Sequence, residues 1–252
     1  MISAARVTGE GTPLRSGRDE ASASAAVRSM FSAVAPRYDF LNHFLSLGRD
    51  IAWRRATARA LAAVLAQPGS RVADLCCGTG DLSFSLARLS QGSVLGADFC
   101  HPMLSRAREK GVGKRCRVHF LEADTLHLPF AHASLDAVTS AFGFRNLADY
   151  GRGIEEMRRV LKPGGRLAIL EFSQVQWPLF GPFFRIYFRY ILPRLGAWIS
   201  GVEGPYQYLP DSVAQFPAQE ALAEKLRKAG FKNVSYRNFT GGVAALHTAE
   251  KV

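Results

Sequence analysis

A glycine-rich turn between a short apolar run and a helical stretch is the first feature of this 252-residue sequence that could bind a ligand. The run covers residues 71–77, and Gly78, Thr79 and Gly80 complete the turn. Glycines at such a turn let backbone N–H groups approach a ligand closely, and the helix N-terminus that follows favours a carboxylate. The pattern therefore predicts a site for a nucleotide-like ligand.

Two acidic residues follow the next predicted strands. Asp98 lies eighteen residues beyond Gly80, where a carboxylate can accept both ribose hydroxyls of a nucleotide, although a helix N-cap is the alternative. Asp124, which Thr125 follows, could bind an adenine amino group or could bond its own backbone in a turn. Met103 could pack on the adenine face or in the core. Together these residues favour a ligand that contains adenosine.

Short β-rich runs alternate with helical stretches after residue 69, which is the pattern of parallel βαβ units in an α/β fold. Seven strands are expected, at residues 71–77, 93–99, 115–121, 135–141, 166–172, 234–238 and 244–251. Helices are expected at residues 81–89, 101–110, 150–161 and 217–229, and residues 162–165 end the third of them. The length suits one such domain, over residues 26–252.

The segments around this alternation have their own composition. Residues 1–25 are rich in Ala, Ser, Gly and Arg but lack the apolar run of a secretory signal, so we expect a disordered leader on a cytoplasmic protein. Apolar residues at helical spacing predict an N-terminal helical cap over residues 26–66. An aromatic insert covers residues 175–215, where Pro182 and Pro193 leave about ten residues of uninterrupted helix, too few to span a membrane.

The charge and the cysteines limit the partners. A net charge of +11 favours an anionic partner, such as a membrane surface or nucleic acid, but no nucleic-acid-binding signature accompanies the basic residues. We therefore expect no nucleic acid partner. The four cysteines include an adjacent pair and no CxxC spacing, so reduced thiols are expected and no metal site.

Several motifs, taken as they stand, resemble class I methyltransferases, and more narrowly the ubiquinone/menaquinone biosynthesis C-methyltransferase family (UbiE/MenG-like). The resemblance covers the chain from about Val27 to Val252. It is carried by the glycine turn, Asp98 and Asp124 described above, and by further segments at residues 30–42, 46–54, 141–146, 161–165, 208–217 and 241–247. The Phe-Gly-x-Arg-Asn motif at residues 142–146 is the most specific of them.

The resemblance implies a Rossmann-like class I methyltransferase fold whose last strand is antiparallel, with S-adenosylmethionine as cofactor. It implies that Thr79, Asp98, Asp124 and Thr125 contact this cofactor. The family commonly has serine where this chain has Ala141, so a contact there must use the backbone. The implied reaction is C-methylation of a polyprenyl quinol precursor, most simply demethylmenaquinol to menaquinol; a benzoquinol of ubiquinone synthesis is the alternative.

Methylation of a quinol carbon needs a base or a group that stabilises a phenolate, because deprotonation of a hydroxyl makes the ring carbon nucleophilic. Arg145 and Asn146 follow the fourth strand at its carboxyl end, where open α/β sheets bind ligands. Arg145 stays cationic and is expected to stabilise the phenolate, while Asn146 orients the ring oxygen. Asp81 could act as the base through a water, or could simply complement the helix dipole.

Four residues are candidates for substrate binding, and each could instead pack the cap or insert onto the core: Tyr38, Asn42, Tyr206 and Tyr208. The insert also carries Arg185 and Arg189 one helical turn apart, which predicts peripheral contact with anionic lipid on the inner face of the membrane. A lid over the site or a homodimer interface is the alternative for this segment.

Three other functions share parts of this sequence pattern. A class I methyltransferase for a soluble small molecule shares the cofactor site but needs no aromatic insert. A non-catalytic adenosyl-binding subunit of a membrane-bound complex is disfavoured by Asp98 and Arg145. A nicotinamide-dependent reductase is disfavoured because Ser83 stands where the dinucleotide fingerprint has glycine, and because no Tyr-x-x-x-Lys pair is recognisable.

Overall fold

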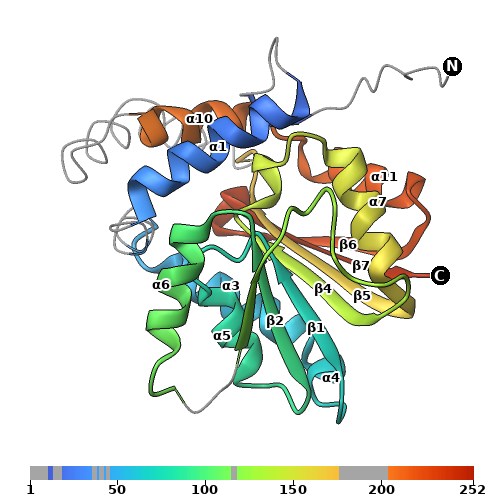
Figure 1. Cartoon of the computed structure of the whole chain (residues 1–252). Coiled ribbons are helices and arrows are strands. Elements are labelled where there is room, and N and C mark those ends of the chain that lie inside the picture. Colours follow the sequence, from blue (N-terminus) through green and yellow to red (C-terminus); the bar gives the residue numbers. More distant parts are fainter. Residues whose placement is uncertain are drawn as a thin grey trace, which may run out of the picture.

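The computed structural model describes residues 11–13, 19–35, 39, 43, 46–114, 118–175 and 204–252, without the side chains of residues 20, 34 and 204–207. Its centre is a seven-stranded sheet with the order β3-β2-β1-β4-β5-β7-β6 (Figure 1). The strands are β1 (Arg71–Leu75), β2 (Ser93–Asp98), β3 (Val118–Glu122), β4 (Leu135–Ala141), β5 (Leu161–Phe172), β6 (Phe231–Phe239) and β7 (Ala244–Lys251). All seven predicted strands are thus confirmed, with shifted ends.

The directions of the strands also agree with the prediction. The first five pair in parallel, and β7 runs antiparallel to both of its neighbours, β5 and β6. The largest difference in a strand boundary is at β5, which begins at Leu161 instead of Arg166. Leu161 already pairs with Leu135, and the register then shifts to Ala137 opposite Arg166, so the predicted loop at residues 162–165 bulges out of a continuing strand.

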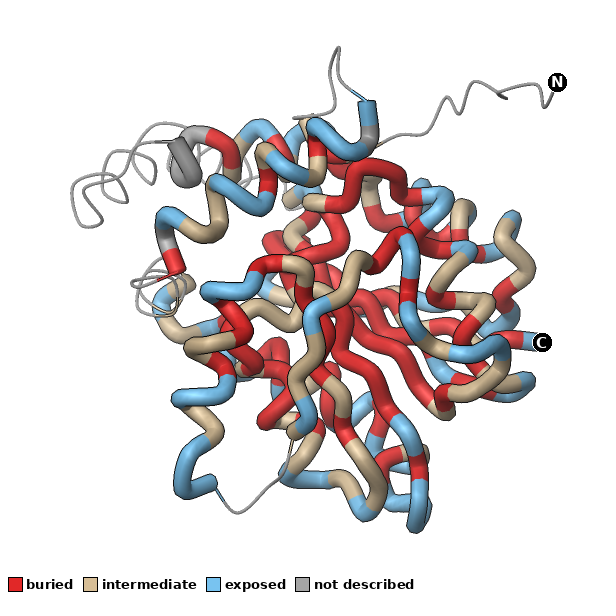
Figure 2. Tube along the Cα trace, viewed as in Figure 1, coloured by how far each residue is buried: buried red, intermediate tan, exposed pale blue. Residues whose placement is uncertain are grey.

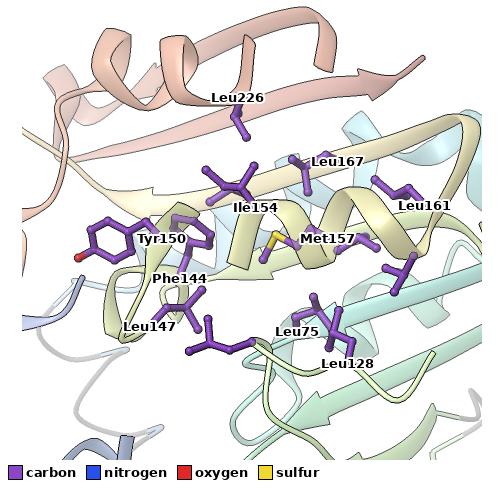
Figure 3. Close-up of a cluster of buried hydrophobic side chains, with 14 of the residues drawn as sticks. Leu75, Leu128, Phe144, Leu147, Tyr150, Ile154, Met157, Leu161, Leu167 and Leu226 are labelled. Carbon is purple, nitrogen blue, oxygen red and sulfur yellow. The ribbon is translucent and has the colours of Figure 1, made fainter. Parts of the chain in front are cut away.

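Helices cover both faces of the sheet because its strands bury alternate residues on opposite faces. On one face Val72 and Ala137 pack with helices α3 (Arg49–Ala60), α4 (Ala62–Leu65) and α5 (Asp81–Ala87). On the other face Leu75 and Leu167 pack with helices α7 (Tyr150–Val160) and α11 (Gln219–Lys228), as Figure 3 shows for Ile154, Met157 and Leu226. Buried residues therefore run along the whole sheet in Figure 2.

The N-terminal part of the chain lies across the carboxyl ends of the strands. Helix α1 (Glu20–Val34) contacts α6 (His101–Gly111) and α10 (Gly204–Gln215) (Figure 1). Its N-cap is Asp19, whose Oδ1 accepts the backbone N–H of Ser22 at 2.7 Å. The predicted end of the disordered leader at residue 25 was therefore wrong, because this aspartate already starts a helix at Glu20.

An earlier piece of the predicted leader is also part of the fold. The backbone N–H of Thr12 donates to the carbonyl of Leu147 at 2.8 Å, and Thr12 is 2% exposed. Among the residues described, no helix combines the length and the apolar character that crossing a membrane requires.

Candidate functional site

A cavity opens at the carboxyl ends of the first four strands, below helix α1. Its empty space is about 610 Å³ when the open mouth is included. Six residues that the sequence analysis selected line it: Gly78, Asp98, Met103, Asp124, Thr125 and Asn146. The topology brings them together because the carboxyl ends of parallel strands meet at one edge of the sheet.

Asp98 ends β2 and is held by two backbone donors. The N–H of Gly78 donates to its Oδ2 and the N–H of Cys100 to its Oδ1, each at 2.8 Å. Burial raises the pKa of Asp98 to about 6, and these two N–H groups limit the rise. The carboxylate thus fastens the glycine turn to the end of β2 and keeps further lone pairs for a ligand.

The turns after β1 and β4 approach each other closely at the cavity. A Cβ on Gly143 would lie 2.3 Å from the Cβ of Cys76, so only glycine fits there. Cys76 and Phe142 both have positive φ, 52° and 60°, which residues with a side chain seldom adopt. Strain of this kind gathers at functional sites, and here it shapes the wall of the cavity.

The two alternatives for Asp124 prove compatible. Its Oδ1 accepts the N–H of Leu126 at 2.9 Å, which is the turn interaction, and its side chain still lines the cavity. Thr125 is 4% exposed and its Oγ1 lies 3.3 Å from the Sγ of Cys76. Met103, at 2% exposure, packs with Phe31 and also faces the cavity. The structure therefore brings together most of the side chains expected around adenosine.

Ser83, which stands in the place of the third glycine, has a structural partner. Its hydroxyl donates to Oδ2 of Asp74 at 2.6 Å, and this contact fixes helix α5 on strand β1. Burial raises the pKa of Asp74 to about 7, against the opposing effect of the Ser83 hydrogen bond.

Thr79 and Asp81 belong to a polar cluster outside the cavity lining. The ammonium of Lys110 lies 2.7 Å from Oδ2 of Asp39 and 3.1 Å from the hydroxyl of Thr79, and it also pairs with Asp81. The hydroxyl of Thr79 donates to Asp39 in turn. The cluster joins the N-terminal part of the chain to helices α5 and α6. Two other predicted cofactor residues, Gly80 and Ala141, also do not line the cavity.

Three more residues extend this cluster to helix α3. His43 lies with its Nδ1 2.8 Å from Asp50 and its Nε2 3.7 Å from Asp81. Asp50 is 2% exposed and also pairs with Arg54. Despite burial, Arg54 and the hydroxyl of Ser46 hold the pKa of Asp50 below its ordinary value.

Replacing Lys110 by Met is expected to lower the free energy of unfolding by about 1–2 kcal/mol, because two carboxylates would lose a shared, partly buried cation. Urea denaturation of both proteins measures this difference. The control is Lys228→Met at the exposed end of helix α11, which should change stability by less than about 0.5 kcal/mol. Equal effects of the two substitutions would show that the Lys110 cluster does not fasten the cap.

Asn146 lines the cavity from the short helix η3 (Phe144–Asn146). Its Oδ1 accepts the hydroxyl of Tyr208 at 2.9 Å. Tyr208 itself is 8% exposed and does not line the cavity, so the structure places it behind Asn146.

Arg145 points away from the cavity. Its guanidinium is 2.9 Å from Oε1 of Glu171, donates to the carbonyl of Phe142, and lies 3.3 Å from the hydroxyl of Ser212. Its backbone N–H also donates to Oε2 of Glu171 at 3.1 Å. Burial raises the pKa of Glu171, and Arg145 opposes the rise. The predicted contact between this guanidinium and a phenolate stays a prediction, since the cation has other partners here.

The sequence analysis did not select Glu171, Lys110, Asp39 or Thr12, which all contact predicted site residues. Glu171 had a signal, because it is the one carboxylate in the apolar run at residues 167–172. Asp39 lies in the segment at residues 30–42 that carries the family resemblance, whereas Lys110 and Thr12 had no such signal. Tyr38, Asn42, Arg185, Arg189 and the side chain of Tyr206 lie outside the described residues.

Several known structures with a similar fold are methyltransferases. An S-adenosylmethionine-dependent methyltransferase from Aquifex aeolicus superposes with a TM-score of 0.56 at 20% identity, covering 78% of this chain and 89% of the other. A possible histamine N-methyltransferase from Thermotoga maritima gives 0.58 at 17% identity, covering 88% and 100%. At these identities the similarity establishes the Rossmann-like class I methyltransferase fold.

Sequence similarity is much stronger. A demethylmenaquinone methyltransferase of Deinococcus radiodurans is 50% identical over 227 residues, which cover 90% of this chain and 92% of the relative. The enzyme of that name from Thermus thermophilus is 50% identical, covering 88% and 100%. A ubiquinone/menaquinone biosynthesis C-methyltransferase of Geobacter sulfurreducens is 42% identical, covering 89% and 88%. The profile of the ubiE/COQ5 methyltransferase family matches residues 19–251, so this chain belongs to that family.

Proposed function

We propose that this protein transfers a methyl group from S-adenosylmethionine to a ring carbon of demethylmenaquinol, giving menaquinol. The observation that carries the proposal is the joint position of Asp98 and Asn146 on one cavity, a carboxylate for a ribose and an amide for a ring oxygen. The names of the relatives that are 50% identical support the menaquinone acceptor. A benzoquinol of ubiquinone synthesis is the second candidate, which the name of the Geobacter relative supports.

The residues on the cavity fit the cofactor. Asp98 retains lone pairs for the ribose hydroxyls. Asp124 can offer Oδ2, which lies 3.7 Å from Nδ1 of His127, to an adenine amino group. Met103 and Leu126 offer apolar surface for the adenine ring. Gly78 lets the backbone approach the ligand, since its φ is positive and it has no side chain.

S-adenosylmethionine supplies an electrophilic methyl group on a sulfonium. When bound, the cofactor would supply this methyl group to a ring carbon of the quinol, which becomes nucleophilic once a neighbouring hydroxyl is deprotonated. The chain has to align the ring carbon with the methyl carbon, exclude water and stabilise the phenolate oxygen. We assign the stabilisation of this oxygen to an N–H of Asn146.

The experiment that tests this function is turnover by the purified protein. With S-adenosylmethionine and demethylmenaquinol, mass spectrometry should find menaquinol and S-adenosylhomocysteine in equal amounts. A demethylated benzoquinol acceptor, assayed in parallel, decides between the two candidates. Binding of S-adenosylhomocysteine without methylation of either acceptor would contradict the quinol function and leave another methyltransferase.

Affinity for S-adenosylhomocysteine is expected to fall as the pH drops below about 6. Only the ionised Asp98 carboxylate accepts two ribose hydroxyls while bonded to Gly78, and burial places its pKa at about 6. Because this pKa is raised, the carboxylate is ionised above pH 7 and protonated below pH 5, so the affinity should be constant above pH 7. Titration calorimetry between pH 5 and 8 measures the change. Asp98→Asn should bind weakly with a flat pH profile, and an unchanged profile in that variant would assign the effect to another group.

We also propose peripheral contact with anionic membranes through the insert that carries Arg185 and Arg189, since the quinol is lipid-soluble and the net charge is +11. Flotation with vesicles that contain phosphatidylglycerol should recover the wild type, and the double substitution of Arg185 and Arg189 by Ala should reduce this recovery. Equal recovery of both proteins would remove this role and favour a lid or a homodimer interface.

A further inference from the structure

A buried chain of hydrogen bonds leads from the N-terminal segment to the amide on the cavity. The hydroxyl of Thr12 lies 2.6 Å from the hydroxyl of Tyr208, and Tyr208 donates to Oδ1 of Asn146 at 2.9 Å. Thr12 is 2% and Tyr208 8% exposed. Three parts of the chain thus meet at one polar contact: the first described residues, helix α10 and the turn after β4.

The protons in this chain can be assigned. A phenol has one proton, and Tyr208 uses it for Oδ1 of Asn146. The hydroxyl of Thr12 must then be the donor in the contact with Tyr208. Because its carbonyl oxygen accepts from Tyr208, Asn146 keeps its two N–H bonds for a ligand in the cavity that it lines. These donors suit an electron-rich oxygen, whereas the reversed amide would repel it.

The backbone around Thr12 is fixed. Its N–H donates to the carbonyl of Leu147 at 2.8 Å, directly after Asn146 in the sequence. Just before it, Gly11 passes so close that a Cβ there would lie 2.0 Å from the carbonyl oxygen of Ala148. The segment is therefore docked against the loop that follows Asn146, which holds the Thr12 hydroxyl in place.

Helix α10 is attached to the same turn by a second contact, one helical turn after Tyr208. Ser212 accepts a hydrogen bond from Nε of Arg145 at 3.3 Å and donates to the carbonyl of Leu209 at 2.9 Å. Because Arg145 is itself paired with Glu171, this contact ties α10 to the end of strand β5. Two contacts at this spacing fix the position of Tyr208 relative to Asn146.

We propose that Tyr208 and Thr12 are positioning residues: they hold the amide of Asn146 with its N–H bonds directed at the acceptor oxygen. Tyr208 then acts through Asn146, and a residue near the N-terminus completes the site. The inference rests on the proposed function for its acceptor, a ring oxygen that becomes negative. Its geometry rests on Thr12, Tyr208 and Asn146 alone.

A double-mutant cycle tests the coupling. Tyr208→Phe is expected to lower kcat by about 30-fold, less than the roughly 100- to 1,000-fold found when a donor to a developing oxyanion is removed, because here the donor is only misplaced. Affinity for S-adenosylhomocysteine should stay within about twofold of the wild type. In an Asn146→Ala background the same substitution should change kcat less than twofold. Both single variants should also raise the pKa of the quinol hydroxyl seen in the pH dependence of kcat, because both lose stabilisation of the phenolate. Full additivity of the two substitutions would overturn the proposal.

Thr12 offers a matched pair of variants. Thr12→Val keeps the shape and removes the donor, so kcat should fall about 3–10-fold, as for loss of one supporting hydrogen bond. Thr12→Ser should restore at least half of that loss. Tyr236→Phe, on strand β6 and away from the cavity, is the control for loss of a phenol and should keep full activity. No difference between Thr12→Val and Thr12→Ser would remove Thr12 from the proposal.

A measurement without turnover separates this proposal from the proposed function. The side-chain amide of Asn146 gives a pair of ¹⁵N-correlated NMR signals, assigned by their absence in Asn146→Ala. These signals should move in Tyr208→Phe and in Thr12→Val, and in the wild type they should move on addition of 1-naphthol, a probe with a phenolic oxygen. Inactivity of the wild type on both quinols would refute the function alone, while Asn146 signals unmoved by Tyr208→Phe would refute the positioning.

Discussion

Asp98→Ala is expected to weaken binding of S-adenosylhomocysteine at pH 7.5 by about 100- to 1,000-fold, measured by titration calorimetry. The substitution removes the acceptor for two ribose hydroxyls, and hydrogen bonds to a charged group contribute about 1.5–3 kcal/mol each. It also removes the partner of the Gly78 N–H, so the glycine turn loses its attachment to the end of β2.

Asp98→Asn separates these two effects. Asparagine keeps an oxygen for the N–H of Gly78 but loses the charge and one acceptor, so its affinity should lie between those of the wild type and Asp98→Ala. The free energy of unfolding without ligand shows whether the turn alone has been disturbed. If Asp98→Ala lowered the affinity for S-adenosylhomocysteine by less than about threefold, Asp98 would not bind the ribose. The adenosine site described above would then be wrong.

Arg145→Met is expected to lower the free energy of unfolding by about 3–5 kcal/mol, because it leaves the carboxylate of Glu171 buried without its cation. In a chain of this size that corresponds to a fall in Tm of about 6–20 °C. Differential scanning calorimetry measures it. The pair is 5% and 1% exposed, so solvent offers the remaining charge little compensation.

The double substitution Arg145→Met with Glu171→Leu is the control, since it removes both charges together. Both variants lack the guanidinium, but only Arg145→Met leaves the Glu171 carboxylate buried without a partner cation. The double variant should therefore have the higher free energy of unfolding. This result would separate two roles for Arg145. If the guanidinium only stabilised a phenolate, its removal would lower kcat and leave stability nearly unchanged. A stability change below about 1 kcal/mol would therefore contradict the structural role assigned to the Arg145–Glu171 pair.

The strands of the sheet and several residues at the cavity edge could be predicted from the sequence alone. Short apolar runs mark β1 and β4, and Gly78 and Asp98 follow or end strands twenty residues apart. These are local signals, since a strand, a turn and a helix start can be recognised from neighbouring residues. The ends of the elements were predicted less well than the elements themselves. Helix α1 begins earlier than predicted, after the cap formed by Asp19, and strand β5 extends across a predicted loop.

The pairing of the polar groups could not be predicted from the sequence, because it depends on how distant parts of the chain pack. Arg145 meets Glu171 across 26 residues, Lys110 meets Asp39 across 71, and Thr12 meets Tyr208 across 196. A hydrogen bond depends on positions within about an ångström, which are set by the packing of whole helices on the sheet. Residue type and spacing report no such distance. The sequence thus predicted several side chains that line the cavity, while the fold decided that Asn146 lines it and that Arg145 instead pairs with Glu171.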